Sequence, residues 1–257
     1  MAESTIWDLT ELTTPATEDL FYIVDDPGGS PLSRKITIAN LLKLFVSNVT
    51  LSVLTGSGTY SPPAGAKTLL IGVVGGGGGG GAGLATDSSG GGGGGGGTSI
   101  KRIAASAVTN GAYVVGGAGL GRTSAQVATA GADSTFNIEG ATIITGNGGA
   151  PGVDGANSIT FGAGQAAGGA GGGASNGDLN IPGRPGERSV QFTGSLGWGG
   201  NGGSSVFGFG GFGTVATAGT VGTAYGGGGA GGHATQAADR NGGDGAAGTI
   251  FILEFYG

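Results

Sequence analysis

Groups that could perform chemistry are few in this sequence and stand far apart. There is one histidine, His233, and no cysteine, so the chain lacks the clusters of imidazole and thiolate ligands that bind transition metals. Glycoside hydrolysis needs two carboxyl groups flanking a sugar, but no spacing pairs the carboxylates of the expected loops: Asp154, Asp178, Glu187, Asp239 and Asp244. We therefore expect a protein that is not an enzyme and that uses no metal or cofactor.

Glycine-rich phosphate-binding patterns match only through composition. The pattern GxGxxG recurs, as it must in a chain with 67 glycines, but nowhere does it join an expected strand to an expected helix, where a dinucleotide site needs it. The segment GAKT at residues 65–68 lacks the upstream glycine of a phosphate-binding loop. Neither pattern predicts nucleotide binding.

Aromatic residues cluster between residues 198 and 225, within glycine-rich sequence. Their rings can pack against the glycine chains, or they can stack on sugar rings or enter an apolar groove of a receptor. Trp198, between two glycines, is the first candidate for the second role. We predict a receptor-binding set of these aromatics and two residues of the segment 233–241: Trp198, Phe207, Phe209, Phe212, Tyr225, His233 and Arg240.

Glycine tracts must position these side chains. A single tract is unstable because glycine loses the most freedom on folding. Extended helices of the polyproline II type have no internal hydrogen bonds, so adjacent glycine chains can bond to one another directly. We expect such a lattice, without a fixed period, from residues 75–83, 90–97, 146–149, 168–173, 197–203, 208–213, 226–232 and 242–248. Its ends are expected to present turns at 84–89, 150–161, 174–192, 195–198, 204–225 and 233–241.

Charge and composition exclude several classes of protein. A net charge of −6 disfavours binding to nucleic acid and to anionic membranes. Charged residues make up only 10% of the chain and the mean hydropathy is +0.17, which argues against disorder despite the 67 glycines. We also expect no secretory signal in the first twenty residues and no transmembrane helix, because no long apolar segment occurs.

Short strands around the tracts predict an all-β fold with a glycine-rich β-sandwich. The apolar runs at 67–74 and 249–256 predict two buried strands that pair at the centre of a sheet. Residues 98–115 predict a hairpin around Asn110-Gly111, and residues 134–145 predict a second hairpin around Glu139-Gly140.

A change in composition near residue 50 divides the chain into residues 1–50 and 51–257. Segments 19–26 and 32–38 predict two strands joined by a turn, and the apolar spacing that follows predicts a short helix within residues 38–48. A hairpin and one helix bury too little apolar surface to be stable alone. We therefore expect this segment to assemble with copies of itself or with a larger particle.

Two stretches resemble proteins of tailed bacteriophages. IWDLTELTTPATEDLFYIVDD with SRKITIANLL resembles the virion-proximal N-terminal segment of tail fibre and appendage proteins. GSGTYSPPAGAKTLLIGVVGGGGGGG with the closing GGDGAAGTIFILEFY resembles the glycine-rich domain at the C-terminus of phage tail proteins. The interrupted tracts are also similar to those of polyglycine-sandwich adhesins, which carry receptor-reading loops. This chain differs from these adhesins in its attachment-like N-terminal segment and its flanking strands.

The resemblance implies a virion protein with two parts. Residues 1–50 are implied to attach it through Trp7, Leu20, Phe21 and Ile23, and residues 51–257 to form a receptor-binding head. The implied partners are other tail or baseplate proteins, a bacterial surface glycan or outer-membrane protein, and copies of the chain in a homotrimer. The implied location is the virion tail, assembled in the host cytoplasm. Two alternatives stay open, namely a structural decoration without a receptor and a depolymerase of surface polysaccharide.

Overall fold

The computed structural model describes residues 20–25, 32–37, 49–84, 88–138, 143–156, 165–193, 196–235 and 238–256. Contacts divide the chain into two units, residues 1–48 with 256–257 and residues 49–255. In the first unit, β1 (Leu20–Asp25) pairs antiparallel with β2 (Leu32–Thr37). The helix predicted within residues 38–48 lies outside the described residues.

The second unit is all-β and contains two five-stranded sheets. One has the strand order β12-β7-β5-β16-β3 and the other the order β11-β10-β9-β8-β4. Their strands are β3 (Val49–Leu54), β4 (Gly58–Tyr60), β5 (Ala66–Val74), β7 (Thr98–Ala104), β8 (Gly111–Val114), β9 (Ser134–Asn137), β10 (Ile143–Gly146), β11 (Ala174–Ser175), β12 (Leu179–Ile181) and β16 (Thr249–Tyr256). Within the described residues, no helix is long and apolar enough to cross a membrane.

The two sheets pack through a hydrophobic core. Strands β5 and β16, neighbours as their apolar runs predict, contribute Leu69, Ile71, Ile250 and Ile252. The opposite sheet contributes Tyr60, Phe136 and Ile144, and the rings of Tyr60 and Phe136 meet edge to face with centroids 6.1 Å apart. Removing these side chains from water stabilises the sandwich. The predicted β-sandwich is thus confirmed.

One predicted hairpin is confirmed and the other is wrong. Strands β9 and β10 pair antiparallel, with Asn137 opposite Ile143. Strands β7 and β8 instead lie in different sheets, because β7 pairs with β5 and β12 while β8 pairs with β4 and β9. A short 3-10 turn, η2 (Ala105–Ala107), leads from one sheet to the other, and Ala105 and Val108 are buried in the core there. Burial of these side chains overrides the local turn signal of Asn110-Gly111.

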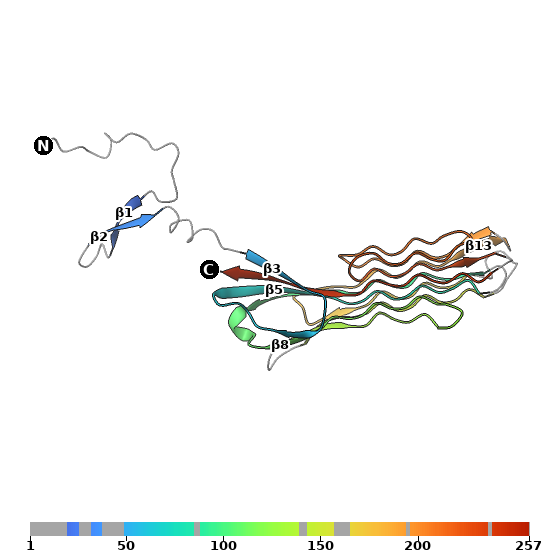
Figure 1. Cartoon of the computed structure of the whole chain (residues 1–257), viewed down its shortest axis with the longest axis horizontal. Coiled ribbons are helices and arrows are strands. Elements are labelled where there is room, and N and C mark those ends of the chain that lie inside the picture. The colour runs from blue at the N-terminus through green and yellow to red at the C-terminus, as the bar shows by residue number, and fades with distance from the viewer. Residues whose placement is uncertain are drawn as a thin grey trace, which may run out of the picture. The chain divides into compact units, whose positions relative to one another are not determined.

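The glycine tracts extend from the sandwich side by side (Figure 1). In the tract 75–83, the N–H groups point in three directions in turn. Gly75, Gly78 and Gly81 donate to the tract 90–97, Gly76 and Gly79 donate to 129–133, and Gly77, Gly80 and Gly83 donate to 240–248, at N···O distances of 2.9–3.0 Å. Three residues per turn is the period of the polyproline II type of helix, so the predicted lattice has this conformation.

Three tracts lie at the centre of the lattice, at residues 75–83, 90–97 and 226–232. The tract 75–83 donates to the three tracts named above and accepts hydrogen bonds from three more, at 116–121, 146–155 and 226–232. Neighbours on every side leave little room for side chains, and the methyl groups of Ala82 and Ala230 are the exceptions in these three tracts. A Cβ at Gly79 would lie 1.9 Å from the carbonyl oxygen of Leu120, and one at Gly94 would lie 2.0 Å from that of Ala170. Glycine is required here by close approach of backbones.

The outer tracts have a period that the glycine runs alone did not indicate. In the tract 146–155, Gly146, Gly149, Gly152 and Gly155 are buried, and the positions between them are partly or fully exposed. In the tract 182–189, a Cβ at Gly183 or Gly186 would collide with the central tract 90–97. In the outer tracts, glycine is thus needed only at every third position, the one that faces inward. The spacing between tracts along the chain has no fixed period, as expected, but the tracts 116–121, 129–133, 182–189 and 218–223, which were not expected, join the lattice.

Candidate functional site

Short strands and tract ends from distant parts of the chain meet at the end of the glycine unit away from β3, which we call the distal end (Figure 1). There β6 (Ser88–Ser89) pairs with β15 (His233–Ala234), and β13 (Val190–Thr193) pairs with β14 (Leu196–Trp198). Isolated bridges join Gly83 to Gly155 and to Arg240. The connections 85–87, 157–164, 194–195 and 236–237, whose flanking residues lie here, are outside the described residues.

Trp198 lies at the distal end and is 42% exposed. Its ring meets that of Phe192 edge to face, with the centroids 5.4 Å apart. Phe192 is 40% exposed and comes from the neighbouring strand β13. Sequence reasoning missed Phe192, although its alternation with the buried Gln191 places it on the outer side of the strand.

His233 is fully buried, unlike the aromatic residues predicted to share its role. Its Nδ1 lies 2.7 Å from the Oγ of Ser89, which in turn donates to Oε1 of Gln191 at 2.7 Å. A Cβ at Gly197 would lie 2.7 Å from Gln191 Oε1 and 3.0 Å from His233 Cε1, so a chain without side chains covers the cluster. The His233 side chain therefore belongs to the interior of the distal end and not to its surface.

Arg240 holds a turn in place at the same end. Its Nε donates to the carbonyl oxygen of Ala216 at 2.9 Å, and its own carbonyl oxygen accepts from Gly83 at 3.0 Å. Ala216 has a φ of 57°, a left-handed conformation that side chains disfavour. The guanidinium contact stabilises this turn between the tracts 208–213 and 218–223.

Phe207 and Tyr225 lie at the sheet end, apart from Trp198. They line an apolar pocket of about 300 Å³ together with Leu51, Val53, Thr249, Phe251 and Leu253. The rings of Phe207 and Phe251 meet edge to face at 5.1 Å, and the Phe251 ring fills the space above Gly72. These two predicted residues therefore connect a tract turn to the outer face of the sheet.

Phe209 and Phe212 project from the flank of the lattice and are 75% and 72% exposed. Two of the three positions in each turn face neighbouring tracts, because Cβ atoms at Gly208 and Gly211, and at Gly210 and Gly213, would collide with them. The remaining position, occupied by Phe209 and Phe212, faces outward. The structure thus divides the predicted set among the distal end, the sheet end and the flank.

Two of the carboxylates considered for chemistry, Asp154 and Asp244, instead complete the edge of the lattice. Asp244 Oδ1 accepts from the N–H of Gly121 at 2.6 Å, and Asp154 Oδ1 accepts from that of Ala82 at 3.0 Å. Arg122 forms an ion pair with Asp154 at 3.5 Å. These carboxylates supply the acceptor that another tract would supply in the interior. No group of three metal-binding side chains occurs among the residues that the structure describes.

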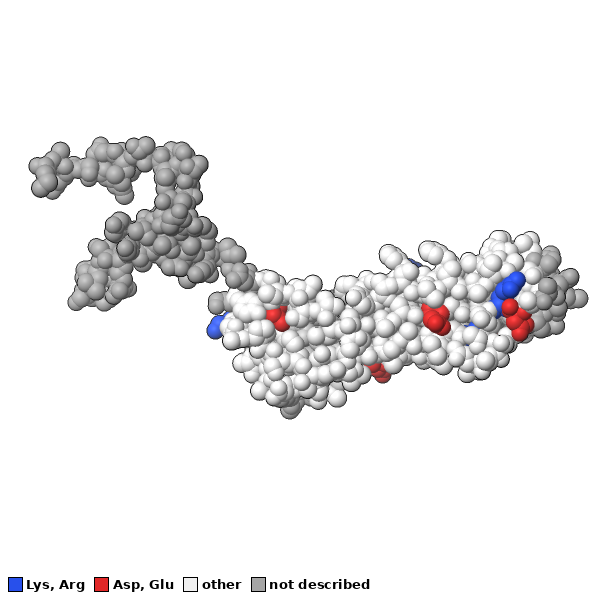
Figure 2. Space-filling view, viewed as in Figure 1, with Lys and Arg blue, Asp and Glu red and all other residues white. Residues whose placement is uncertain are grey.

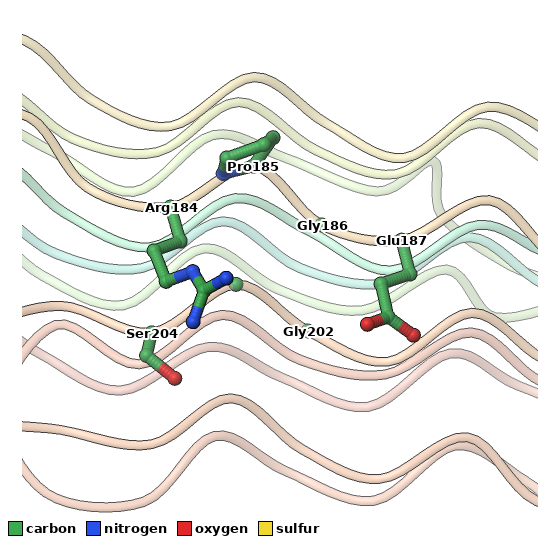
Figure 3. A pocket seen from close by; sticks show the side chains of 7 residues that line it. Arg184, Pro185, Gly186, Glu187, Gly202 and Ser204 are labelled. Atoms are coloured by element: carbon green, nitrogen blue, oxygen red, sulfur yellow. The ribbon is translucent and has the colours of Figure 1, made fainter.

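A polar groove of about 290 Å³ runs along the flank between the tracts that carry Arg184 and Gly202 (Figure 3). Arg184 and Glu187 are three residues apart, one turn of their helix, and both extend toward the tract of Gly202 and Ser204 (Figure 3). Glu187 accepts from the side-chain amide of Asn201 at 2.7 Å. The sequence placed residues 183–188 in the expected turn 174–192 and did not indicate this groove.

The attachment residues predicted in the first unit are only partly described. Leu20, Phe21 and Ile23 occupy strand β1, where Phe21 pairs with Ile36 and Ile23 pairs with Arg34. Trp7 lies outside the described residues. The role of these residues stays a prediction.

Comparison with known proteins identifies the larger unit. A search of curated proteins found no match. The family described as the glycine-rich domain matches residues 52–253, which include the whole tract lattice and both five-stranded sheets except the outer ends of β3 and β16. The chain therefore belongs to the glycine-rich domain family.

Proposed function

We propose that this chain is a tail fibre or baseplate-associated fibre protein of a tailed bacteriophage, and that residues 51–257 bind a bacterial surface receptor during adsorption. The observation that carries the proposal is that short strands from distant parts of the chain, β6 with β15 and β13 with β14, meet at the distal end. The unit begins with β3 at its sheet end, and the tract lattice separates this entry point from the distal end (Figure 1). A rigid scaffold that holds several connections together is typical of recognition proteins.

The lattice favours recognition because the tracts and short strands that reach the distal end are already hydrogen bonded to one another. Its backbone groups are paired between tracts, so the connections start from fixed ends. Binding then orders few additional residues. The exposed pair Phe192 and Trp198 supplies aromatic surface at this end, and aromatic side chains commonly anchor interfaces.

The proposed partners follow from the same arrangement. The first unit, through Trp7, Leu20, Phe21 and Ile23, is proposed to dock on tail or baseplate proteins. The receptor is a surface glycan or outer-membrane protein. Three copies in a homotrimer raise the effective concentration of weak sites, so that the particle binds firmly although each contact is weak. The proposed location is the virion tail.

Binding of the labelled full-length protein to bacterial cells tests the proposal. Saturable binding to strains that the corresponding phage adsorbs is expected, together with density for the chain on the tail of the intact particle. Trp198→Ala is expected to weaken binding about tenfold, as loss of an aromatic anchor does. The matched control is Val114→Ala in β8, which removes an exposed apolar side chain from the sheet end and should leave binding unchanged.

Two other results would contradict the proposal. Density on the capsid, with no cell binding, would assign the chain a purely structural role. Release of oligosaccharides from purified surface polysaccharide would assign it a depolymerase activity instead.

A further inference from the structure

The exposed rings of Phe209 and Phe212 form an ordered feature that folding does not explain. The two residues are one helical turn apart on the tract 208–213, so their rings lie on the same side, separated by about 9 Å along the tract. Val206 and Val215 continue the spacing of three at either end and are also exposed. We call Phe209 and Phe212 the flank ridge.

The neighbouring tract fixes the backbone of each ridge residue. Thr220 Oγ1 accepts from the N–H of Phe212 at 2.6 Å and donates to its carbonyl oxygen at 3.1 Å. Thr223 Oγ1 donates to the carbonyl oxygen of Phe209 at 3.2 Å. The two threonines are also three residues apart, so the ridge and its support share one period. The positions of both rings along the flank are therefore set before any ligand binds.

The surroundings of the ridge are neutral and rich in hydroxyl groups. Residues 189–238 contain no Asp, Glu, Lys or Arg. Figure 2 shows that charged side chains are also sparse and scattered over the viewed face of the lattice. Thr217, Thr220 and Thr223 are exposed beside the ridge, and a hydroxyl oxygen that donates one bond can still accept others. Of the charged side chains on the tracts beyond, Glu187 is bonded to Asn201 and Arg240 donates to Ala216. A neutral ligand with hydroxyl groups therefore fits the ridge better than a charged ligand does.

We propose that the flank ridge binds a neutral, extended, β1→4-linked glycan by stacking pyranose rings on Phe209 and Phe212. The C–H face of a pyranose complements the electron-rich face of an aromatic ring, and the equatorial hydroxyls of the sugar face the threonines. An extended β1→4-linked chain turns over at each sugar, so alternate sugars present the same face to two rings set one helical turn apart. The proposal rests on the proposed function, for which it names the class of receptor.

A second copy of the chain is the competing occupant of the ridge. The two rings, continued by Val206 and Val215, make an apolar strip one tract wide with hydroxyl groups beside it, whereas a stable protein interface has a broad apolar centre. The apolar strip with a polar border therefore fits a saccharide better than it fits another protein surface.

Calorimetric titration of the full-length protein with cellohexaose, chitohexaose and mannohexaose tests the inference. Binding to at least one of these probes is expected, with maltohexaose, which is α-linked and coiled, binding at least tenfold more weakly. The double variant Phe209→Ala/Phe212→Ala is expected to raise Kd about tenfold, and Phe209→Trp/Phe212→Trp to retain binding. The control Leu120→Ala/Val153→Ala removes exposed apolar side chains from other outer tracts and should leave Kd unchanged.

Two results would overturn the inference. One is binding to none of the three β1→4-linked probes. The other is a smaller oligomer for the Phe209→Ala/Phe212→Ala variant in sedimentation analysis, which would make the ridge an interface between copies. Cell binding by the unaltered protein, measured in parallel, keeps the two proposals distinguishable. Cell binding without glycan binding would contradict only the proposal that the flank ridge binds a glycan. Glycan binding without cell binding would contradict only the proposed function.

Discussion

The sandwich and the tract lattice are stabilised in opposite ways within one unit. In the sandwich, large side chains such as Phe136 and Ile252 are fully buried and their removal from water drives packing. In the three central tracts of the lattice, almost every residue is glycine, and backbone groups bond between tracts in three directions. The comparison teaches that a buried core can be built from peptide groups, provided that every neighbour is close enough to satisfy them.

The two regions also tolerate change differently. A sandwich core can repack around a substituted side chain, because rotamers adjust. The lattice has no rotamers to adjust, since its interior contacts join backbone to backbone. An added methyl group must therefore separate two tracts and lengthen their hydrogen bonds.

The largest effect is expected for Gly79→Ala in the central tract. The new Cβ would lie 1.9 Å from the carbonyl oxygen of Leu120. We expect the free energy of unfolding to fall by about 3 kcal/mol or more, because overpacking adds to the loss of hydrogen bonds. Thermal or denaturant unfolding of the full chain measures it.

Gly117→Ala is the matched control on the outer tract 116–121, where a Cβ meets nothing within 4 Å. This substitution should leave stability unchanged or raise it slightly, because alanine restricts the unfolded chain. Equal losses in Gly79→Ala and Gly117→Ala would mean that close approach of backbones does not determine where glycine is needed.

A smaller effect is expected at the edge of the lattice, for Asp244→Ala. This substitution leaves the N–H of Gly121 without the acceptor that it bonds at 2.6 Å. Loss of a hydrogen bond to a partly buried backbone group costs about 1–3 kcal/mol. Local amide exchange at Gly121 should become faster.

Asp244→Asn separates the hydrogen bond from the charge, because its amide oxygen can still accept. We expect it to recover most of the lost stability. If Asp244→Asn were as destabilising as Asp244→Ala, charge would matter at the lattice edge and the acceptor role would be wrong.

From the sequence, the residues that build each of the two regions could be predicted better than the way in which those residues pack together. The apolar runs at 67–74 and 249–256 predicted neighbouring strands because continuous burial leaves a strong local pattern. The placement of β7 and β8 in different sheets was missed because it depends on contacts of Ala105 and Val108 with distant residues. A local turn signal contains no information about those contacts.

The lattice shows the same limit. Long runs at 75–83 and 90–97 predicted glycine packing, since only a tract surrounded on all sides needs glycine at every position. Outer tracts such as 182–189 need it only at every third position, and the sequence there looked like a loop. The candidate residues could be chosen from the sequence by residue type. Whether Phe209 faces solvent or His233 is buried depends on how each tract is rotated about its axis, and the neighbouring tracts determine that rotation.

The smallest effect is expected at Asp178, beside the sheet end, and it depends on pH. The N–H of Arg102 donates to its Oδ2 at 2.9 Å, and Lys101 Nζ lies 3.3 Å from its Oδ1. The backbone hydrogen bond from Arg102, followed by the bond from Lys101, lowers the pKa of Asp178 below its ordinary value of 3.8. The carboxylate is the form that is favoured in the folded state. It therefore contributes stability above pH 3.8, and this contribution is lost as the pH falls through the lowered pKa.

Two measurements check this expectation. An NMR titration should place the midpoint of Asp178 below 3.8, and Lys101→Met should raise it only in part, because the Arg102 N–H remains. The difference in Tm between the unaltered protein and Asp178→Asn should shrink below pH 3.8 and should stay small throughout, because the side chain of Asp178 is 58% exposed. A midpoint at or above 3.8 would show that a surface carboxylate beside the sandwich, unlike Asp244 at the lattice edge, gains nothing from the backbone it faces.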